Sequence, residues 1–219
     1  AFHITTRWRV ENSGSLPANE DFAMNVVTIF NSPAAPVPND LRFGGIAPGS
    51  HHTVIVRWAK KANGSKRFSF IALRSDGQFV SWNGTAWVTG GAVENVIPAG
   101  KEETQWSFEL VVAGGNLTIK ARDDQGAIRF DTSGQSLAIK IGDLQPWLVL
   151  GDSNLDMPVG VNYLYDSVET DIPVTGTTSG FIRFRETLGA KGRLGKLKIS
   201  PTLASAGQIS IKARSADTV

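Results

Sequence analysis

The chain has 219 residues, no cysteine and a formal net charge of +2. Without cysteine it has no disulfide framework, no thiolate nucleophile and no cysteine-based zinc site. The small net charge argues against a nucleic-acid partner, and the apolar runs are too short to cross a membrane, so neither partner is expected. A chain of this length is long enough for one large domain with a core that needs no cross-links.

Alternation of apolar and polar residues is the main signal in the first half of the chain. Residues 2–10 have the pattern of a half-buried strand, and its apolar side holds Phe2, Ile4, Trp8 and Val10. Further strands are expected at residues 22–31, 52–59 and 67–74. Residues 32–39 contain three prolines and predict a loop between the first two of these strands.

Two hairpins are expected in the middle of the chain. Asn83-Gly84 lies between two β-rich runs, and both residues tolerate the positive φ of a type I′ turn. Gly114-Gly115 turns residues 105–113 into residues 116–122. The facing apolar sides of this second hairpin are Trp106, Phe108, Leu110 and Val112, and Leu117, Ile119 and Ala121. Later strands are expected at residues 127–131, 137–141, 147–150, 181–185, 194–199 and 208–213.

These strands, about a dozen of the usual length, are accompanied by no sustained helical period. The predicted fold is all-β: an antiparallel two-sheet β-sandwich, jelly-roll or concanavalin-like, with a C-terminal β extension. A linker-like stretch at residues 173–180 suggests a boundary. We expect a sandwich domain over residues 1–175 and a basic C-terminal extension or assembly arm over residues 176–219.

Charge is segregated in the last third of the chain. Residues 143–180 contain six acids and no Lys or Arg, whereas residues 181–219 contain eight bases and two acids. Blocks of opposite sign on one chain favour contacts between copies. The predicted acidic contacts are Asp152, Asp156, Asp166, Glu169 and Asp171. The predicted basic contacts are Arg183, Arg185, Lys191, Arg193, Lys196 and Lys198.

No catalytic residue and no cofactor is predicted. His51 and His52 are adjacent on an expected strand, so they point to opposite faces and do not suit one metal ion. Asp152, Asn154 and Asp156 have the first spacings of a calcium loop. Met157 and Tyr163 then replace the glycine and glutamate of an EF-hand, so no metal is expected beyond this weak candidate.

Two alternatives involve glycans. Trp82 and Trp87 flank the Asn83-Gly84 turn, where exposed indole rings would stack on a sugar, as in a lectin-like carbohydrate-binding module. Glu169 and Asp171 are the pair nearest to the two acids on one strand of the sandwich-fold glucanases, which would make the chain a glycan hydrolase or lyase. Glu109 stands alone between apolar neighbours.

Two resemblances bear on function. Ser75-Asp76-Gly77-Gln78 followed by Trp82-Asn83-Gly84-Thr85-Ala86-Trp87-Val88 resembles strand–turn units of tailed-phage tail and fibre proteins. Residues 68–171, in which Trp106 precedes the hairpin at 112–117 and a Gly151-Asp152 loop follows, resemble concanavalin-type and laminin-G-like sandwiches. The resemblances imply a virion or surface-binding role.

The leading prediction is a non-enzymatic structural protein of a bacteriophage virion: a capsid decoration, collar, tail or fibre component. Its expected location is the virion, after assembly in the host cytoplasm. Its expected partners are further copies of itself and other virion proteins, with a surface glycan as partner in the lectin-like alternative.

Overall fold

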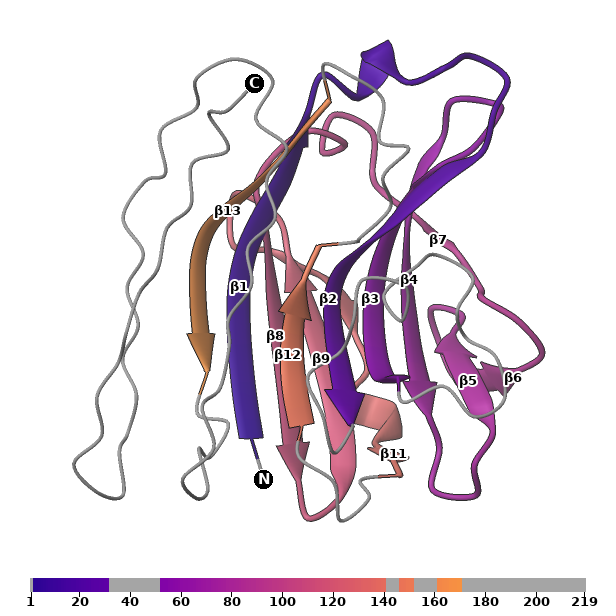
Figure 1. Ribbon diagram of the computed structural model, residues 1–219, viewed down its shortest axis with the longest axis vertical. Helices are drawn as coiled ribbons and strands as arrows, with labels where there is room; N and C mark the ends of the chain where they lie inside the picture. Colours follow the sequence, from indigo (N-terminus) through magenta and orange to yellow (C-terminus); the bar gives the residue numbers. More distant parts are fainter. Residues whose placement is uncertain (1, 32–51, 141–145, 152–160, 171–219) are drawn as a thin grey trace, which may run out of the picture.

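The computed structural model describes residues 2–31, 52–140, 146–151 and 161–170. Within these ranges the chain forms two antiparallel β-sheets whose inner faces share one hydrophobic core (Figure 1). Apart from strands, these ranges contain two short 3-10 helices, at Ser13–Ser15 and Ser133–Gln135. None of their helices is long and apolar enough to span a membrane. The predicted all-β, two-sheet sandwich is confirmed.

Sheet A contains six of the described strands. Its main path runs through β10 (Ile128–Asp131), β9 (Asn116–Arg122), β8 (Trp106–Ala113), β1 (Phe2–Glu11) and β13 (Asn162–Thr170), in that order. The sixth strand, β11 (Leu137–Ala138), pairs with β9. The N-terminal strand therefore lies between two strands from much later in the chain (Figure 1).

Sheet B contains seven of the described strands. Its main path is β12 (Pro146–Leu150), β2 (Phe22–Asn31), β3 (His52–Lys60), β4 (Lys66–Leu73), β5 (Phe79–Trp82) and β6 (Trp87–Thr89). The seventh strand, β7 (Asn95–Val96), pairs with β4. Five neighbouring strands of this sheet, β2 to β6, are consecutive in sequence, so it forms largely by local pairing.

The predicted inward faces of sheet A are confirmed. Trp8 in β1 and Phe108 in β8 are fully buried, and Ile119 in β9 is only 1% exposed. A one-residue slip of β1 would instead bury Arg7 and Arg9, which are both exposed. Burial of the alternate apolar residues thus sets the register of these three strands.

The two predicted hairpins differ in their turns. Gly114 and Gly115 have φ of 57° and 79° and form the expected two-residue connection between β8 and β9. At the other hairpin Trp82 pairs with Trp87, so the loop has four residues, and only Gly84 has positive φ. The type I′ turn predicted there is wrong. The Asn83 side chain instead accepts the N–H groups of residues 85 and 86 and stabilises the wider loop.

β13 was not among the predicted strands, and a bulge explains why. Arg7 of β1 pairs with Ser167 but the next residue, Trp8, pairs with Tyr165, so Asp166 is an extra residue in β13. The bulge moves the inward positions from odd to even numbers along the strand. The period-two pattern is therefore broken in the middle, and the remaining half-patterns are too short to predict a strand.

The centre of sheet B is buried on both faces. The inner face of β3 carries the predicted Val54, Val56 and Trp58, all buried. On the opposite face Ile55 is 1% and Arg57 is 6% exposed, and Nε of Arg57 lies 3.3 Å from Oδ1 of Asn25. Sheets covered on both faces lose the solvent-facing polar stripe of a simple sandwich. A basic residue at an alternate position of a strand, such as Arg57, is therefore not necessarily exposed in this sheet.

Two tyrosines of β13 allow a matched test of the contact between the sheets. The hydroxyl of Tyr165 donates to the carbonyl oxygen of Val26 in β2 at 2.5 Å. The hydroxyl of Tyr163 is buried without a hydrogen-bond partner in the described structure, and burial raises its pKa. Removing a hydrogen-bonded hydroxyl costs about 1 kcal/mol, whereas removing an unpartnered one is neutral or stabilising.

We therefore expect Tyr165→Phe to lower the free energy of unfolding by about 1 kcal/mol. Tyr163→Phe should leave it unchanged or raise it slightly. The oxygen of Val26 also accepts the N–H of Gly151, which keeps the first loss small. Urea denaturation of both variants measures the difference. An equal loss in the two variants would show that the Tyr163 hydroxyl has a partner.

Candidate functional site

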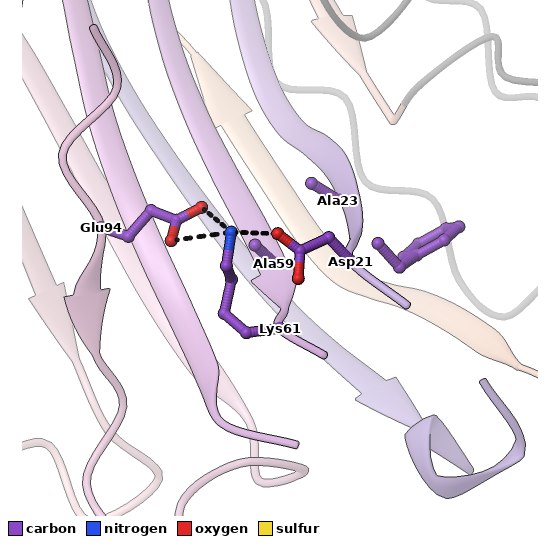
Figure 2. Close-up of a pocket in the computed structure, with 6 residues that line it drawn as sticks. Asp21, Ala23, Ala59, Lys61 and Glu94 are labelled. Carbon is purple, nitrogen blue, oxygen red and sulfur yellow. Dashed lines mark hydrogen bonds and ion pairs between the residues drawn. The ribbon is translucent and has the colours of Figure 1, made fainter. Parts of the chain in front are cut away.

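A small pocket lies where β2 begins and β3 ends. It is lined by Asp21, Phe22, Ala23, Ala59, Lys61 and Glu94. Its volume of about 130 Å³ is below that of ordinary small-molecule sites, which are roughly 300–1,000 Å³. In Figure 2 the ammonium group of Lys61 lies between the carboxylates of Asp21 and Glu94.

The charged groups of this pocket are bound to one another. Lys61 Nζ forms an ion pair with Asp21 and lies 3.3 Å from Oε2 of Glu94. Asp21 Oδ1 also accepts the N–H of Ala62 at 2.7 Å, and Arg67 lies 3.9 Å from Glu94. These contacts join the start of β2, the turn between β3 and β4, and the segment before β7. The cluster fastens three segments at one end of sheet B.

The pKa shifts in the pocket stabilise the charged forms. The hydrogen bond from Lys61 is the main cause that holds the pKa of Asp21 below its usual 3.8. The same bond raises the pKa of Lys61 above its usual 10.5. A nucleophilic amine or a general acid or base needs a pKa close to the working pH, and both shifts move away from it. The contacts of the pocket's charged groups therefore stabilise the ends of the strands that they join.

A second cluster surrounds the buried carboxylate of Asp123, whose side chain is 0% exposed. Its Oδ2 accepts Nε–H of Arg129 at 2.8 Å, and Lys101 Nζ lies 3.8 Å away. Its Oδ1 accepts the N–H groups of Gln125 and Ala127, both at 3.0 Å. These bonds close the turn that leads from β9 into β10. The cluster therefore stabilises the turn between β9 and β10 and joins this turn to Lys101.

The acid dependence of stability tests the role of Asp123. Burial, the largest single influence, raises its pKa, but the hydrogen bonds from Arg129, Ala127 and Gln125 together outweigh it. The pKa therefore lies below the usual 3.8. A carboxyl with a depressed folded pKa stabilises the native state fully above the unfolded pKa, and this contribution is lost as the pH falls through the folded pKa.

Asp123→Asn should therefore lower stability at neutral pH and weaken the further loss between about pH 5 and pH 3. Thermal unfolding across that pH range checks both effects. Glu20→Gln, at an exposed position, is the control and should behave as the unaltered chain. Parallel pH profiles for Asp123→Asn and the unaltered chain would contradict the role given to this carboxylate.

Glu109 acquires partners that the sequence does not reveal. It lies in β8 between β1 and β9, where His3 Nε2 is 3.3 Å and Arg122 NH1 is 3.1 Å from its carboxylate. This arrangement joins the side chains of three neighbouring strands on the outer side of sheet A. The predicted Gly114-Gly115 hairpin already places Arg122 close to Glu109, whereas His3 could be identified as a neighbour only from the strand order.

Most of the predicted contact residues lie outside the described residues. Asp166 and Glu169 are described, and both are exposed on β13, with Asp166 3.9 Å from Arg7. Outside the described ranges are Asp152, Asp156, Asp171, Arg183, Arg185, Lys191, Arg193, Lys196 and Lys198. The predicted extension, residues 176–219, lies outside them as well, so the domain boundary stays a prediction.

The residues of the weak calcium-site candidate are also not described by the structure. Asp152, Asn154 and Asp156 lie outside the described residues, as does His51. Across the part of the chain that is described, no three His, Asp or Glu side chains are grouped to hold a metal ion. His3 lies on the exposed side of β1, as its strand pattern predicts.

The two tryptophans of the glycan alternative are both engaged in the fold. Trp82 is 3% exposed and belongs to the core, and its ring contacts Trp87 edge-to-face at 5.6 Å between centroids. The half-buried Trp87 donates its Nε1–H to the carbonyl oxygen of Gln135 at 2.9 Å. Trp82 therefore does not belong to an exposed stacking platform, contrary to that alternative. The contacts of these two tryptophans hold the β5–β6 hairpin against the rest of the sandwich.

Comparison with known proteins adds no relative. No protein-family model matches the chain, and no curated protein or solved structure is significantly similar to it. The described structure is an antiparallel two-sheet β-sandwich in which Lys61 is paired with Asp21 and Glu94, and Arg129 with Asp123.

Proposed function

We propose that this chain is a non-enzymatic structural protein of a bacteriophage virion that acts through contacts between subunits. The observation that carries the proposal is the segregation of charge: residues 143–180 hold six acids and no Lys or Arg, and residues 181–219 hold eight bases and two acids. A copy that displays both blocks attracts further copies in one orientation, which suits rings, tubes and head-to-tail arrays.

The described clusters support this proposal over catalysis. The carboxylates of Asp21 and Asp123 are held ionised by neighbouring cations, and Lys61 is held protonated. Catalytic sites have the opposite character, because their groups must gain and lose protons near the working pH. The ionised groups of these clusters are therefore suited to stabilising the fold that displays the charge blocks.

The resemblance of the Ser75–Gln78 and Trp82–Val88 units to tail and fibre proteins supports the virion setting. In that setting the chain is a decoration, collar, tail or fibre component, and its partners are further copies of itself and other virion proteins. A cysteine-free sandwich suits assembly in the reducing host cytoplasm.

Salt dependence of self-association tests the proposal. Contacts between exposed charge blocks weaken as the Debye length falls from about 10 Å at 0.1 M salt to about 3 Å at 1 M. We expect the full chain to sediment as oligomers at low salt and to dissociate toward monomer at high salt. Negative-stain electron microscopy at low salt should show rings or regular arrays. A monomer at both salt concentrations, even at high protein concentration, would sink the proposal.

A further inference from the structure

β13 differs from the other strands that end the two described sheets. It has nine residues, whereas β10 has four, β12 five and β6 three. Short length, a bulge or a proline protects an edge strand from pairing with another chain. β10 has a bulge and β12 begins with Pro146. β13 also has a bulge, at Asp166, but it is about twice as long as the next longest of these strands. β13 is therefore the described edge best suited to accept a further strand.

The outer side of β13 is acidic. Asp166 and Glu169 are exposed, and the side chain of Asp166 is 61% exposed. Glu169 forms no ion pair within the described residues, and Asp166 lies 3.9 Å from Arg7. The other nearby cation, Arg9, is paired with Glu11 at 2.8 Å. Positive side chains on an added strand would find an acidic neighbour at Glu169.

The segment that follows β13 in sequence has the complementary pattern. Residues 181–185, Phe-Ile-Arg-Phe-Arg, place Arg183 and Arg185 at odd-numbered positions and the apolar Ile182 and Phe184 at even-numbered ones. In β13 the inward positions near its end are Val168 and Thr170, which lie opposite Thr6 and Ile4 of β1. An added strand with its arginines outward and its apolar residues inward matches both sides of β13.

The connection between the two segments favours a second copy as the donor. Residues 171–180 form a stretch of ten residues with one proline and two glycines. Hairpin connections usually have about 2–5 residues. A ten-residue connection is longer than a hairpin requires, so residues 181–185 can reach a neighbouring copy, as in segment exchange between subunits.

We propose that the β13 edge is a docking site for a second copy of this chain, which adds residues 181–185 as an antiparallel strand with Arg183 and Arg185 beside Glu169 and Asp166. The inference rests on the proposed function, because it names the contact through which the copies assemble. Main-chain hydrogen bonds along β13 supply the contact, and the opposite charges set its register.

Charge reversal in the full chain tests the contact. Arg183→Glu/Arg185→Glu should weaken low-salt self-association by about tenfold or more, and so should Asp166→Lys/Glu169→Lys. The chain with all four changes should recover most of the lost association, because the pairs are restored with opposite sign. Glu20→Lys/Glu102→Lys, with the same change in net charge as the β13 variant, should not be rescued by the arginine changes. Failure of the fourfold variant to recover would overturn the inference.

Cross-linking then identifies the donor, since the natural chain has no cysteine to interfere. A chain with Ser167→Cys is mixed with chains that carry one cysteine each within residues 181–185 and is oxidised mildly. A disulfide-linked dimer of the two variants is expected, because neighbouring strands bring Cα atoms within the roughly 4.4–6.8 Å of a disulfide. Cross-links that form only inside a chain carrying both cysteines would overturn the role of a second copy. That result would overturn this inference and leave the proposed function standing, as long as the chain still assembles in a salt-dependent way. Absence of salt-dependent assembly would instead refute the proposed function itself.

Discussion

Phe68→Ala is expected to lower the free energy of unfolding by about 3–5 kcal/mol, the usual cost of truncating a fully buried phenylalanine. Phe68 lies in β4 of sheet B and is 0% exposed. Its ring contacts Trp106 at 5.0 Å and Phe108 at 5.1 Å, both edge-to-face and both from sheet A, and Trp8 at 6.1 Å. One substitution therefore removes contacts with two strands of the opposite sheet and leaves a cavity between the sheets.

Thermal and urea unfolding measure this loss. For a domain of this size each kcal/mol lowers Tm by about 2–4 °C, so a fall of roughly 6–20 °C is expected. Phe79→Ala is the matched control, because Phe79 is half-buried and lies outside the core cluster. Equal losses in the two variants would show that the aromatic contacts between the sheets do not dominate the core.

Asn95→Ala should be the most damaging of the polar substitutions, with an expected loss of about 2–3 kcal/mol. Asn95 is 9% exposed, and its Nδ2 donates to the carbonyl oxygens of Phe68 at 3.3 Å and Trp82 at 2.9 Å. It thereby links β7 to β4 and to the end of β5. Alanine would leave two carbonyl oxygens without this donor in a site that water does not readily reach.

Asn95→Asp separates loss of the donor from loss of volume. A carboxylate would face the same two carbonyl oxygens, so burial and repulsion should raise the pKa of the new acid. A raised folded pKa means that stability is greatest below the unfolded pKa and is lost as the pH rises through the folded one. Relative to the natural chain, the aspartate variant should therefore regain stability as the pH is lowered from 7 toward 4. Equal stability of this variant and the natural chain at pH 7 would contradict the donor role.

The candidate site was only partly predictable. The acidic character of Asp166 and Glu169 is visible in sequence, because a run without Lys or Arg needs no structure to be noticed. The pairing of Lys61 with Asp21 and Glu94 is not visible, because each of these two partners is 33 or more positions away from Lys61 in the sequence. The sequence correctly predicts that Trp82 lies beside a hairpin turn. Whether its ring faces solvent or the core depends on what packs against that hairpin.

Local pattern is sufficient for most strands and for their inward faces. The alternation of buried and more exposed residues in β1, β8 and β9 is strict. The register that buries the apolar side of each strand has a much lower free energy than a register that exposes it. Gly114-Gly115 likewise determines its own turn, because two consecutive residues with positive φ are easily formed only by glycine.

The tertiary structure decided the features that depend on distant partners. It placed β1 between β8 and β13, added the bulge at Asp166, and buried Arg57 beside Asn25. None of these has a local signature, because each strand pairing contributes little free energy by itself. Their outcome depends on the summed burial of both sheets. Sequence patterning therefore settles most of the residues that form strands and which side of each is apolar, whereas packing between the sheets settles strand order, edge strands and the partners of each charge.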